Sequence, residues 1–525
     1  MFRGHPSGLK VLFFTEMWER FGYYLMIGIF SLYMLDAVMG GLAFPRERAA
    51  ETYGTFVALV YLTPFFGGVL ADRILGYRRS IVLGGLLMAG GYFCVAFGGL
   101  SLFYLGLGLV IAGNGFFKPN ISTIVGKLYE EDSPLRDSAY NIFYMGINIG
   151  AFASNFVAAL LRNRFGWPAA FAAAGVGMLL GVAIFLAFRK HLAHVPDRGT
   201  AGTIEDRALR EILLSIFAPA AILGAFGYFY LGPMIGSPST TAFALAVLPA
   251  IVYYTRLYLT APAAEKGPIG ALLSIFLVVI VFWMIFHQNG STMTYWADEN
   301  TRREAGVLAP VLRTLHFDQD ATIGETIHDP DAQGSYWRNV PPENRPAPGL
   351  KVTLVSTELF QSINPFFIIV LTPLLVGFWG ALRARGMEPS TPAKIAWGLL
   401  VTAFSALVMV AAVLANDGGA TKASPWWLVA SYLLITVGEL CLSPMGLSLV
   451  SRLAPARVGA AMMGGWFLAT SVGNKLAGVL AGFWEKLPIA AIFGINAVAA
   501  ALAALAIALM TPKIRSIMAE HSRRS

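Results

Sequence analysis

Charged residues are scarce in this chain of 525 residues. Aspartate, glutamate, lysine and arginine together make up 13% of it, whereas hydrophobic residues make up 56%. A soluble protein of this length could not remove so much apolar side chain from water, because its surface grows almost as fast as its volume. The composition therefore excludes an ordinary soluble protein and predicts a chain that is embedded in a membrane.

Cysteine is rare in the sequence, and nucleotide-binding motifs are absent from it. The two cysteines, Cys94 and Cys441, both fall in apolar segments, so they exclude a disulfide framework and offer no metal-ligand spacing. No phosphate-binding loop of the P-loop type occurs, which argues against ATP as an energy source. The charges within apolar segments show neither metal-ligand spacing nor a nucleophile beside a base, so we expect no enzyme, no metal and no cofactor.

Apolar windows recur along the whole sequence. A helix that crosses a bilayer needs roughly 20 mostly apolar residues. We predict fourteen such spans, at 9–35, 53–70, 81–99, 102–124, 139–161, 169–188, 212–230, 242–259, 269–297, 354–381, 395–414, 426–450, 458–483 and 489–510.

Positive charge is concentrated in alternate connections between these spans. Short connections with Arg78 and Arg79, with Arg189 and Lys190, and with Arg383 alternate with charge-poor ones. Because positively charged loops stay in the cytoplasm, we expect a multi-pass protein of the plasma (inner) membrane with both termini cytoplasmic. The net charge of +8 is thus a sign of topology, and we expect no nucleic-acid partner.

The seventh and eighth spans carry almost no polar side chains, and a charge-free turn at 232–240 joins them. We interpret them as a hairpin inserted between two six-helix halves, since two bundles around a midplane site is the usual architecture of secondary transporters. The predicted divisions are a first bundle at 1–190, a linker with the hairpin at 191–265, a second bundle at 266–512 with an extracytoplasmic loop or cap at 298–351, and a basic cytoplasmic tail at 513–525.

The first span carries a stripe of polar residues. Glu16, Glu19, Arg20, Tyr23 and Tyr24 recur at three- and four-residue spacing, which places them on one helical face. A charge at the centre of a span costs about 2.5–3.5 kcal/mol, so such residues persist chiefly where they have a function. Two carboxylates around one guanidinium cannot all be charged at low cost, so one carboxylate should bind a proton readily. The alternative is a cluster that snorkels to the cytoplasmic end of the helix.

Two further charges are isolated in later spans. Glycines and Pro119 flank Lys118, which predicts a local break in the fourth span that exposes the amine to a cavity. Glu439 lies in the middle of its span and needs a cation, which is either Lys118 or the ammonium group of a substrate. Asn364 and Pro365 are expected to interrupt the span that follows the long loop.

Three neutral residues leave two interpretations open. Asn148 in the fifth span either makes a hydrogen bond between helices or contacts a substrate. Trp283 and Trp466 either pack in the core or form the walls of pockets for substrate side chains.

At these positions the sequence resembles the proton-dependent oligopeptide transporter family, a branch of the major facilitator superfamily. The family signature ExxERFxYY matches 16–24 in full, and 140–152 fits a second signature with Asn148 at its centre. The segment 68–79 is similar to the cytoplasmic loop motif of the superfamily. Further blocks occur in family order, at Lys118-Pro119-Asn120, Asn364-Pro365, Glu439 to Pro444, and Trp466.

The resemblance implies an all-α polytopic membrane protein with the major facilitator fold, which imports di- and tripeptides with protons by alternating access. It implies a proton site at Glu16, Glu19 and Arg20, and a peptide carboxylate bound by Arg20 and Lys118. The peptide amino group would bind Glu439 with Asn364 and Ser443, its carbonyl would bind Asn148, and its side chains would lie against Tyr23, Tyr24, Tyr61, Trp283 and Trp466. The alternatives are a symporter of another small anion or metabolite, such as nitrate, within the same family, or a membrane enzyme or receptor.

The sequence departs from the family at the expected outer gate. Two family charges that can pair across this gate are missing, where the chain has Ile27 and the pair His287-Gln288. We therefore expect the gate to close by packing and by a titratable group, His287, whose protonation would favour outward opening. The alternative is that His287 packs or caps within its own helix.

Overall fold

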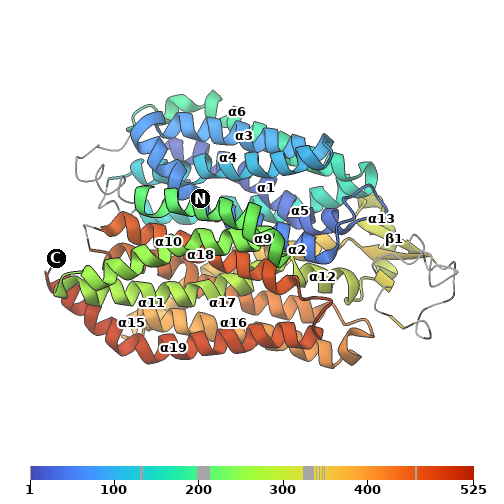
Figure 1. Cartoon of the computed structure of the whole chain (residues 1–525). Helices are drawn as coiled ribbons and strands as arrows, with labels where there is room; N and C mark the ends of the chain where they lie inside the picture. Colours follow the sequence, from blue (N-terminus) through green and yellow to red (C-terminus); the bar gives the residue numbers. More distant parts are fainter. Residues whose placement is uncertain are drawn as a thin grey trace.

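The computed structural model describes residues 2–130, 133, 135–197, 213–322, 336, 337, 340, 341, 343, 345, 347, 349, 351–455 and 458–524. Figure 1 shows α3, α4 and α6 on one side of the molecule, α11, α16 and α19 on the other, and α10 and α18 between them. The helices of the first half are α1 (Ser7–Leu35), α2 (Arg46–Leu70), α3 (Tyr77–Phe97), α4 (Leu100–Lys127), α5 (Leu135–Phe165) and α6 (Trp167–Ala187). Short helical turns follow α2 and α6, at Ala71–Leu75 and Arg189–Leu192.

The inserted hairpin has one interrupted and one continuous arm. The first arm consists of η3 (Leu213–Phe217), α8 (Ala218–Phe226), η4 (Gly227–Leu231) and α9 (Gly232–Ile235), and the second is α10 (Pro238–Thr260). The linker predicted before it lies outside the described residues from 198 to 212.

The second half begins with α11 (Ala263–Phe286). It continues through η5 (His287–Gly290), α12 (Thr292–Glu299), η6 (Gly306–Leu308), α13 (Ala309–Leu315), η8 (Thr357–Ser362), α15 (Ile363–Ala384), α16 (Thr391–Leu414), η9 (Asp417–Gly419), α17 (Trp426–Leu453), α18 (Gly459–Ala481) and α19 (Ile489–Arg524). A two-stranded antiparallel sheet pairs β1 (Asp318–Thr322) with β2 (Lys351–Val355), so the cap region contains strands that the all-α prediction did not include.

Each predicted span coincides with a helical segment. Eleven segments among the described residues are long and apolar enough to cross a membrane. The other three are α1, α2 and α18, so the number fourteen stays a prediction. Polar residues such as Glu16, Glu19 and Arg20 lower the hydropathy of α1. The molecule is a multi-pass membrane protein, because long apolar helices of this number have no other solvent that suits them.

Two expected irregularities have different outcomes. The prediction of a break in the fourth span was wrong, because α4 continues through Pro119 to Lys127. Side chains on the following turn support the helix there, since Ser122 and Thr123 donate to the carbonyls of Lys118 and Pro119. The span that follows the long loop changes from 3₁₀ to α-helix between Ser362 and Ile363, just before Asn364 and Pro365. Because these two residues lie in the first turn of α15, an interruption caused by them stays a prediction.

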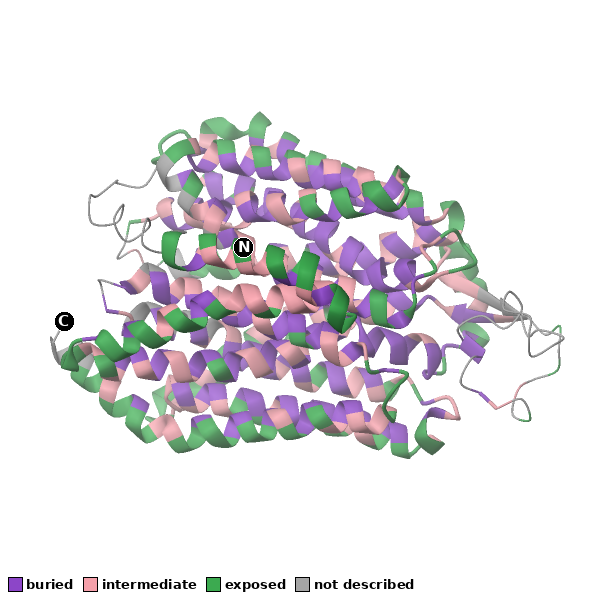
Figure 2. Ribbon diagram, in the orientation of Figure 1, coloured by how far each residue is buried: buried purple, intermediate pink, exposed green. Residues whose placement is uncertain are grey.

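The buried side chains form separate clusters in the first and the second half of the chain. One cluster of buried side chains contains only residues between 9 and 195, and the others draw almost entirely on residues after 215. Figure 2 shows buried residues where helices face one another and exposed residues on the outward faces. The outward faces are themselves apolar, as Leu505 and Leu509 of α19 illustrate, which suits contact with lipid.

The two halves meet most intimately along α2 and α18. A Cβ atom on Gly54 would lie 2.7 Å from the Cα atom of Gly478, so only glycine allows this backbone approach. Nearby, Ser471 donates to the carbonyl of Ala58 at 2.8 Å. Small residues that let helix backbones approach are a general device for packing inside membranes.

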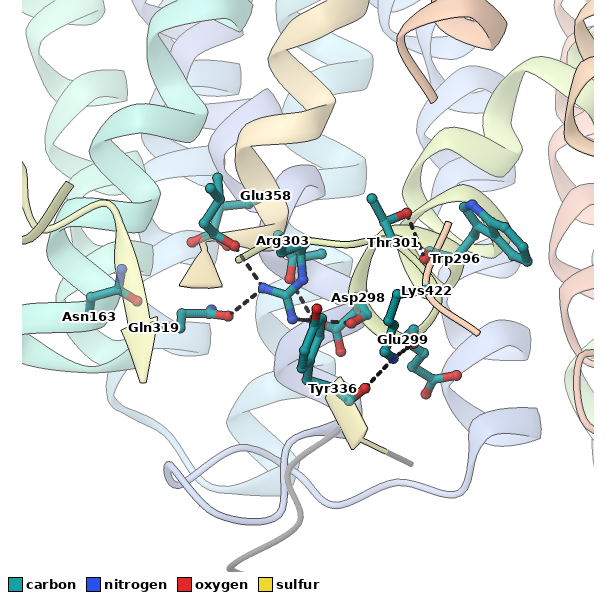
Figure 3. Close-up of polar contacts among 12 residues, drawn as sticks. Asn163, Trp296, Asp298, Glu299, Thr301, Arg303, Gln319, Tyr336, Glu358 and Lys422 are labelled. Carbon is teal, nitrogen blue, oxygen red and sulfur yellow. Dashed lines mark hydrogen bonds and ion pairs between the residues drawn. The ribbon is translucent and has the colours of Figure 1, made fainter. Parts of the chain in front are cut away.

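A polar cap covers one end of the molecule, on the side of β1 in Figure 1, which we call the loop end. Figure 3 shows Arg303 at its centre. The guanidinium of Arg303 donates to Gln319 at 3.0 Å, to the carbonyl of Val355 at 2.7 Å and to Asp298 at 3.0 Å. These bonds fix the strands to the end of α12.

Lys422 holds the cap from the other side, because its ammonium donates to the carbonyls of Glu299 and Tyr336. Burial, together with the nearby charge of Arg303, lowers the pKa of Lys422 to about 8. Between this pH and the usual value of 10.5, a docked Lys422 is neutral while a detached one is protonated. Docking then releases a proton, so it becomes more favourable as the pH rises.

We expect hydrogen-exchange protection of the β2 amides, corrected for intrinsic exchange rates, to increase between pH 7.5 and 9.5. In Lys422→Met this increase should disappear, while Lys486→Met should behave as the wild type, since Lys486 is half exposed and pairs with Glu47, away from the strands. If the protection of the β2 amides still increases with pH in Lys422→Met, then Lys422 is not the group that titrates.

Candidate functional site

The polar stripe of α1 forms a buried cluster. Glu16 and Glu19 are fully buried and Arg20 is 5% exposed. The Arg20 guanidinium binds both carboxylate oxygens of Glu19, and its Nε lies 3.6 Å from Glu16. It also donates to Asn114 of α4 at 3.1 Å, and Asn114 donates to the carbonyl of Val60 at 2.9 Å. The cluster is thus fixed from three helices.

Lys118 completes the cluster. Its ammonium forms an ion pair with Glu16, and its side chain is 28% exposed. The interpretation that Lys118 pairs with Glu439 was therefore wrong in this state of the protein. Two carboxylates and two cations balance one another here, so every charge of the cluster has a partner.

Glu439 has only neutral partners among the described residues. It accepts a hydrogen bond from Asn364 at 3.1 Å and one from the Tyr144 hydroxyl at 3.4 Å. Asn364 is itself held by Thr436 at 2.9 Å. Glu439 is 8% exposed, and a carboxylate so removed from water normally needs a cation. This side chain is therefore suited to bind an ammonium group.

Aromatic side chains lie near both the cationic cluster and Glu439. The hydroxyls of Tyr24 and Tyr61 are within electrostatic range of both Arg20 and Glu439. Tyr23 packs edge-on against Tyr24, with ring centroids 5.4 Å apart, and its ring lies 4.8 Å from the Arg20 guanidinium. These residues place the predicted carboxylate and ammonium sites in one region.

His287 lies among aromatic rings that come from both halves. Its ring centroid is 5.2 Å from that of Tyr61 in α2 and 5.2 Å from that of Trp283 in α11. The imidazole is 9% exposed, and Phe286 also packs against it, with ring centroids 5.3 Å apart. The structure thus favours the packing interpretation, and a role in proton transfer stays a prediction.

The remaining predicted residues lie on neighbouring helices. Asn148 donates to the carbonyl of Tyr144 one turn earlier, so its contact is within α5 rather than between helices. Ser443 is half-buried one turn beyond Glu439 on α17. Trp466 is 3% exposed and packs on α17, where a Cβ atom on Gly446 would lie 1.9 Å from its ring.

The loop end is closed by ion pairs between the halves. Arg46 at the start of α2 pairs with Glu299 of α12 and, at 3.1 Å, with Glu485. Arg162 of α5 pairs with Glu358 of η8 at 3.1 Å, and both side chains are almost completely buried. These ion pairs between helix ends join the halves at a place where the sequence predicted none, and a gate closed by packing and His287 stays a prediction.

We expect Arg46→Met to open the loop end, because it removes the guanidinium that pairs with Glu299 across the two halves. Breaking one partner of a buried ion pair typically costs 3–5 kcal/mol. The measurement is the alkylation rate of a cysteine at Ser31, a buried α1 residue that donates to the carbonyl of Gly290, in a background without Cys94 and Cys441. The rate should rise about tenfold or more.

Arg48→Met is the matched control, because Arg48 is exposed and, among the described residues, contacts Phe44 and Tyr104 of its own half. Equal alkylation rates in Arg46→Met and the control would show that Arg46 does not hold the gate.

Several site residues were missed by sequence reasoning. Asn114 was seen only as part of a glycine-rich segment, and Tyr144 only as part of a family signature. A signal was available, since both are polar residues inside apolar spans, but Arg46 and Arg162 stand at helix ends, where charge is ordinary. No group of three or more His, Cys, Asp or Glu side chains in the described part of the chain could hold a metal ion.

Membrane-spanning helices around buried charges, in two halves joined by an inserted hairpin, define an integral membrane transporter of the major facilitator type. Residues 78–315 and 350–499 match PTR2, which is described as the POT family. The chain belongs to this family of peptide transporters.

Relatives of similar length support the assignment. The chain is 32% identical to the peptide transporter YePEPT of Yersinia enterocolitica, across 98% of this chain and 96% of that protein. It is also 32% identical to a di-/tripeptide transporter of Lactococcus lactis, across 90% and 89% of the two chains. A crystal structure of the peptide transporter POT in complex with sulfate has 31% sequence identity and a TM-score of 0.80, and the match covers 98% of this chain and 96% of that one.

Proposed function

We propose that this protein imports di- and tripeptides by proton-coupled symport. The observation that carries the proposal is the contrast between Glu439, whose recorded partners are neutral, and the cationic cluster of Arg20 and Lys118. A short peptide is a zwitterion, so its ammonium group suits Glu439 and its carboxylate suits Arg20 and Lys118. Relatives named as peptide transporters support the same substrate class and do not favour a nitrate transporter.

Proton coupling follows from the charge balance of the cluster. Arg20 and Lys118 are neutralised by Glu19 and Glu16. A peptide carboxylate that enters adds one negative charge, and the low dielectric makes an excess charge costly. Protonation of Glu16 or Glu19 releases a cation for the peptide, so peptide and proton bind better together than singly.

Direction follows from the membrane orientation. In our proposal both termini lie in the cytoplasm of a cell whose inner membrane holds the protein, so the loop end faces outward. The Arg46 and Arg162 ion pairs would then seal the outer entrance, and proton and peptide would load after these pairs separate. The two six-helix bundles, predicted at 1–190 and 266–512, would be the bodies that move relative to each other.

The test is uptake of labelled di-alanine into liposomes that contain the purified protein. An imposed inward proton gradient should drive accumulation, and a proton ionophore should abolish it. Binding of di-alanine without any uptake would instead indicate a receptor. Uptake that ignores the proton gradient would overturn symport while leaving peptide transport intact.

A further inference from the structure

An apolar cavity of about 380 Å³ lies away from the charged site, between the inserted hairpin and the two helices α2 and α18. Phe217 and Ala220 line it from the first arm of the hairpin, and Ala246 lines it from α10. Leu59 of α2 and Leu468 of α18 form the opposite wall. The volume is within the range of about 300–1,000 Å³ that is usual for small-ligand sites.

The hairpin is held at both ends, which keeps the cavity from collapsing. At the loop end, the Glu51 carboxylate of α2 accepts hydrogen bonds from Ser237 at 3.2 Å and from the Thr240 amide at 3.1 Å. Towards the other end, the Tyr254 hydroxyl of α10 donates to the carbonyl of Ala461 in α18 at 2.6 Å. The cavity lies along the hairpin between these attachment points.

The walls of the cavity are unsuited to water. A buried water needs two to four polar partners. Two of the few polar side chains that line it are already engaged, since Thr55 donates to the carbonyl of Glu51 and Tyr254 to that of Ala461. Apolar cavities without such partners stay dry and accept apolar guests.

The dimensions and surroundings of the cavity point to one guest. Its lining on α10 extends from Ser239 to Tyr254, which is about 22 Å at 1.5 Å per residue. Half of a bilayer's hydrocarbon core is about 15 Å thick, so the slot is long enough for an extended lipid chain. Hydrocarbon is also what surrounds the hairpin, since Ile222 and Phe229 are each 69% exposed on membrane-spanning segments.

We propose that this cavity binds an acyl chain of a membrane lipid. The chain fills the space that the anchored hairpin leaves against α2 and α18. Because α2 belongs to the first half and α18 to the second, the bound lipid contacts both halves and the hairpin at once. The site is separate from the peptide site, and the proposal does not depend on which substrate is transported.

The test uses the full protein in phosphatidylglycerol vesicles that contain a phospholipid with a diazirine in the middle of one acyl chain. After illumination, mass spectrometry locates the adducts. We expect adducts on Leu468 in the cavity wall as well as on Leu248 and Val252, which are exposed on α10. Ala246→Phe, which fills the cavity, should reduce the Leu468 adducts about tenfold and leave those on Leu248 and Val252 unchanged.

A second filling variant, Ala220→Leu, tests the same space from the other arm in case Ala246→Phe does not fold. Leu248→Phe is the control, because it adds the same ring on the exposed side of α10 and should leave Leu468 labelling at the wild-type level. Wild-type protein labelled at Leu248 but not at Leu468 would overturn the proposal, whether detergent, water or a second copy then fills the space. So would Leu468 labelling that both filling variants leave unchanged.

Discussion

Uptake of free-amine dipeptides should fall to background in Glu439→Gln. The substitution keeps the size and polarity of the side chain and removes only its negative charge. The peptide ammonium would then enter a region of low dielectric beside Asn364 and Tyr144, neither of which supplies a counter-charge. Loss of one partner from a buried charge pair typically costs 2–5 kcal/mol, which corresponds to a loss in affinity of about 30-fold or more.

The chemical control is an N-acetylated dipeptide, whose uptake should be equally poor with wild type and Glu439→Gln. The matched variant is Glu388→Gln, because Glu388 pairs with Arg383 at 2.6 Å on the loop between α15 and α16, away from the site. It should transport as the wild type does. If Glu439→Gln still prefers free over acetylated peptide to the wild-type extent, the amino group binds elsewhere.

Gradient-driven accumulation should disappear in Glu16→Gln and in Glu19→Gln, while exchange of peptide across the membrane continues. Each substitution removes a carboxylate that can hold the coupling proton, but exchange requires no net proton movement. The accumulation ratio should fall to about one, since the coupling between proton and peptide is what concentrates the peptide. The readout is labelled di-alanine in proteoliposomes, first under an imposed gradient and then with unlabelled peptide on the opposite side.

Glu47→Gln is the matched control for Glu16→Gln and Glu19→Gln, because Glu47 is an exposed carboxylate that pairs with Lys486. It should retain accumulation. Full accumulation in both Glu16→Gln and Glu19→Gln would remove the α1 cluster from the proton pathway. Loss of exchange together with accumulation would instead indicate that the cluster is needed to bind peptide.

The α1 cluster could be predicted because helical geometry is local. Glu16, Glu19 and Arg20 share a face through their spacing alone, and the family signature identifies the same stretch. The helices could be predicted for a similar reason, because a segment that crosses the membrane must be long and apolar whatever helices pack against it. Glu439 could likewise be identified as a candidate site residue, because a carboxylate in the middle of an apolar span is rare.

Pairing between distant segments could not be predicted in the same way. The sequence suggested Glu439 as the protein partner of Lys118, and only the packing of α4 on α1 selects Glu16. The ion pairs at the loop end were missed because Arg46 and Arg162 stand at helix ends, where basic residues are common, and their partners follow no period. The β1 and β2 strands are separated by a long polar stretch, so neither strand signals the other.

The contact between Gly54 and Gly478 has a mechanical consequence. Backbones in direct contact cannot move closer, so in the proposed alternating access the halves would rock about this point. Along α2, about 12 Å of helix separates Gly54 from Arg46, whereas about 24 Å separates it from Leu70. As arms of a lever, these lengths differ by a factor of about two. A rotation that just parts Arg46 from Glu299 therefore swings the opposite end of α2 about twice as far.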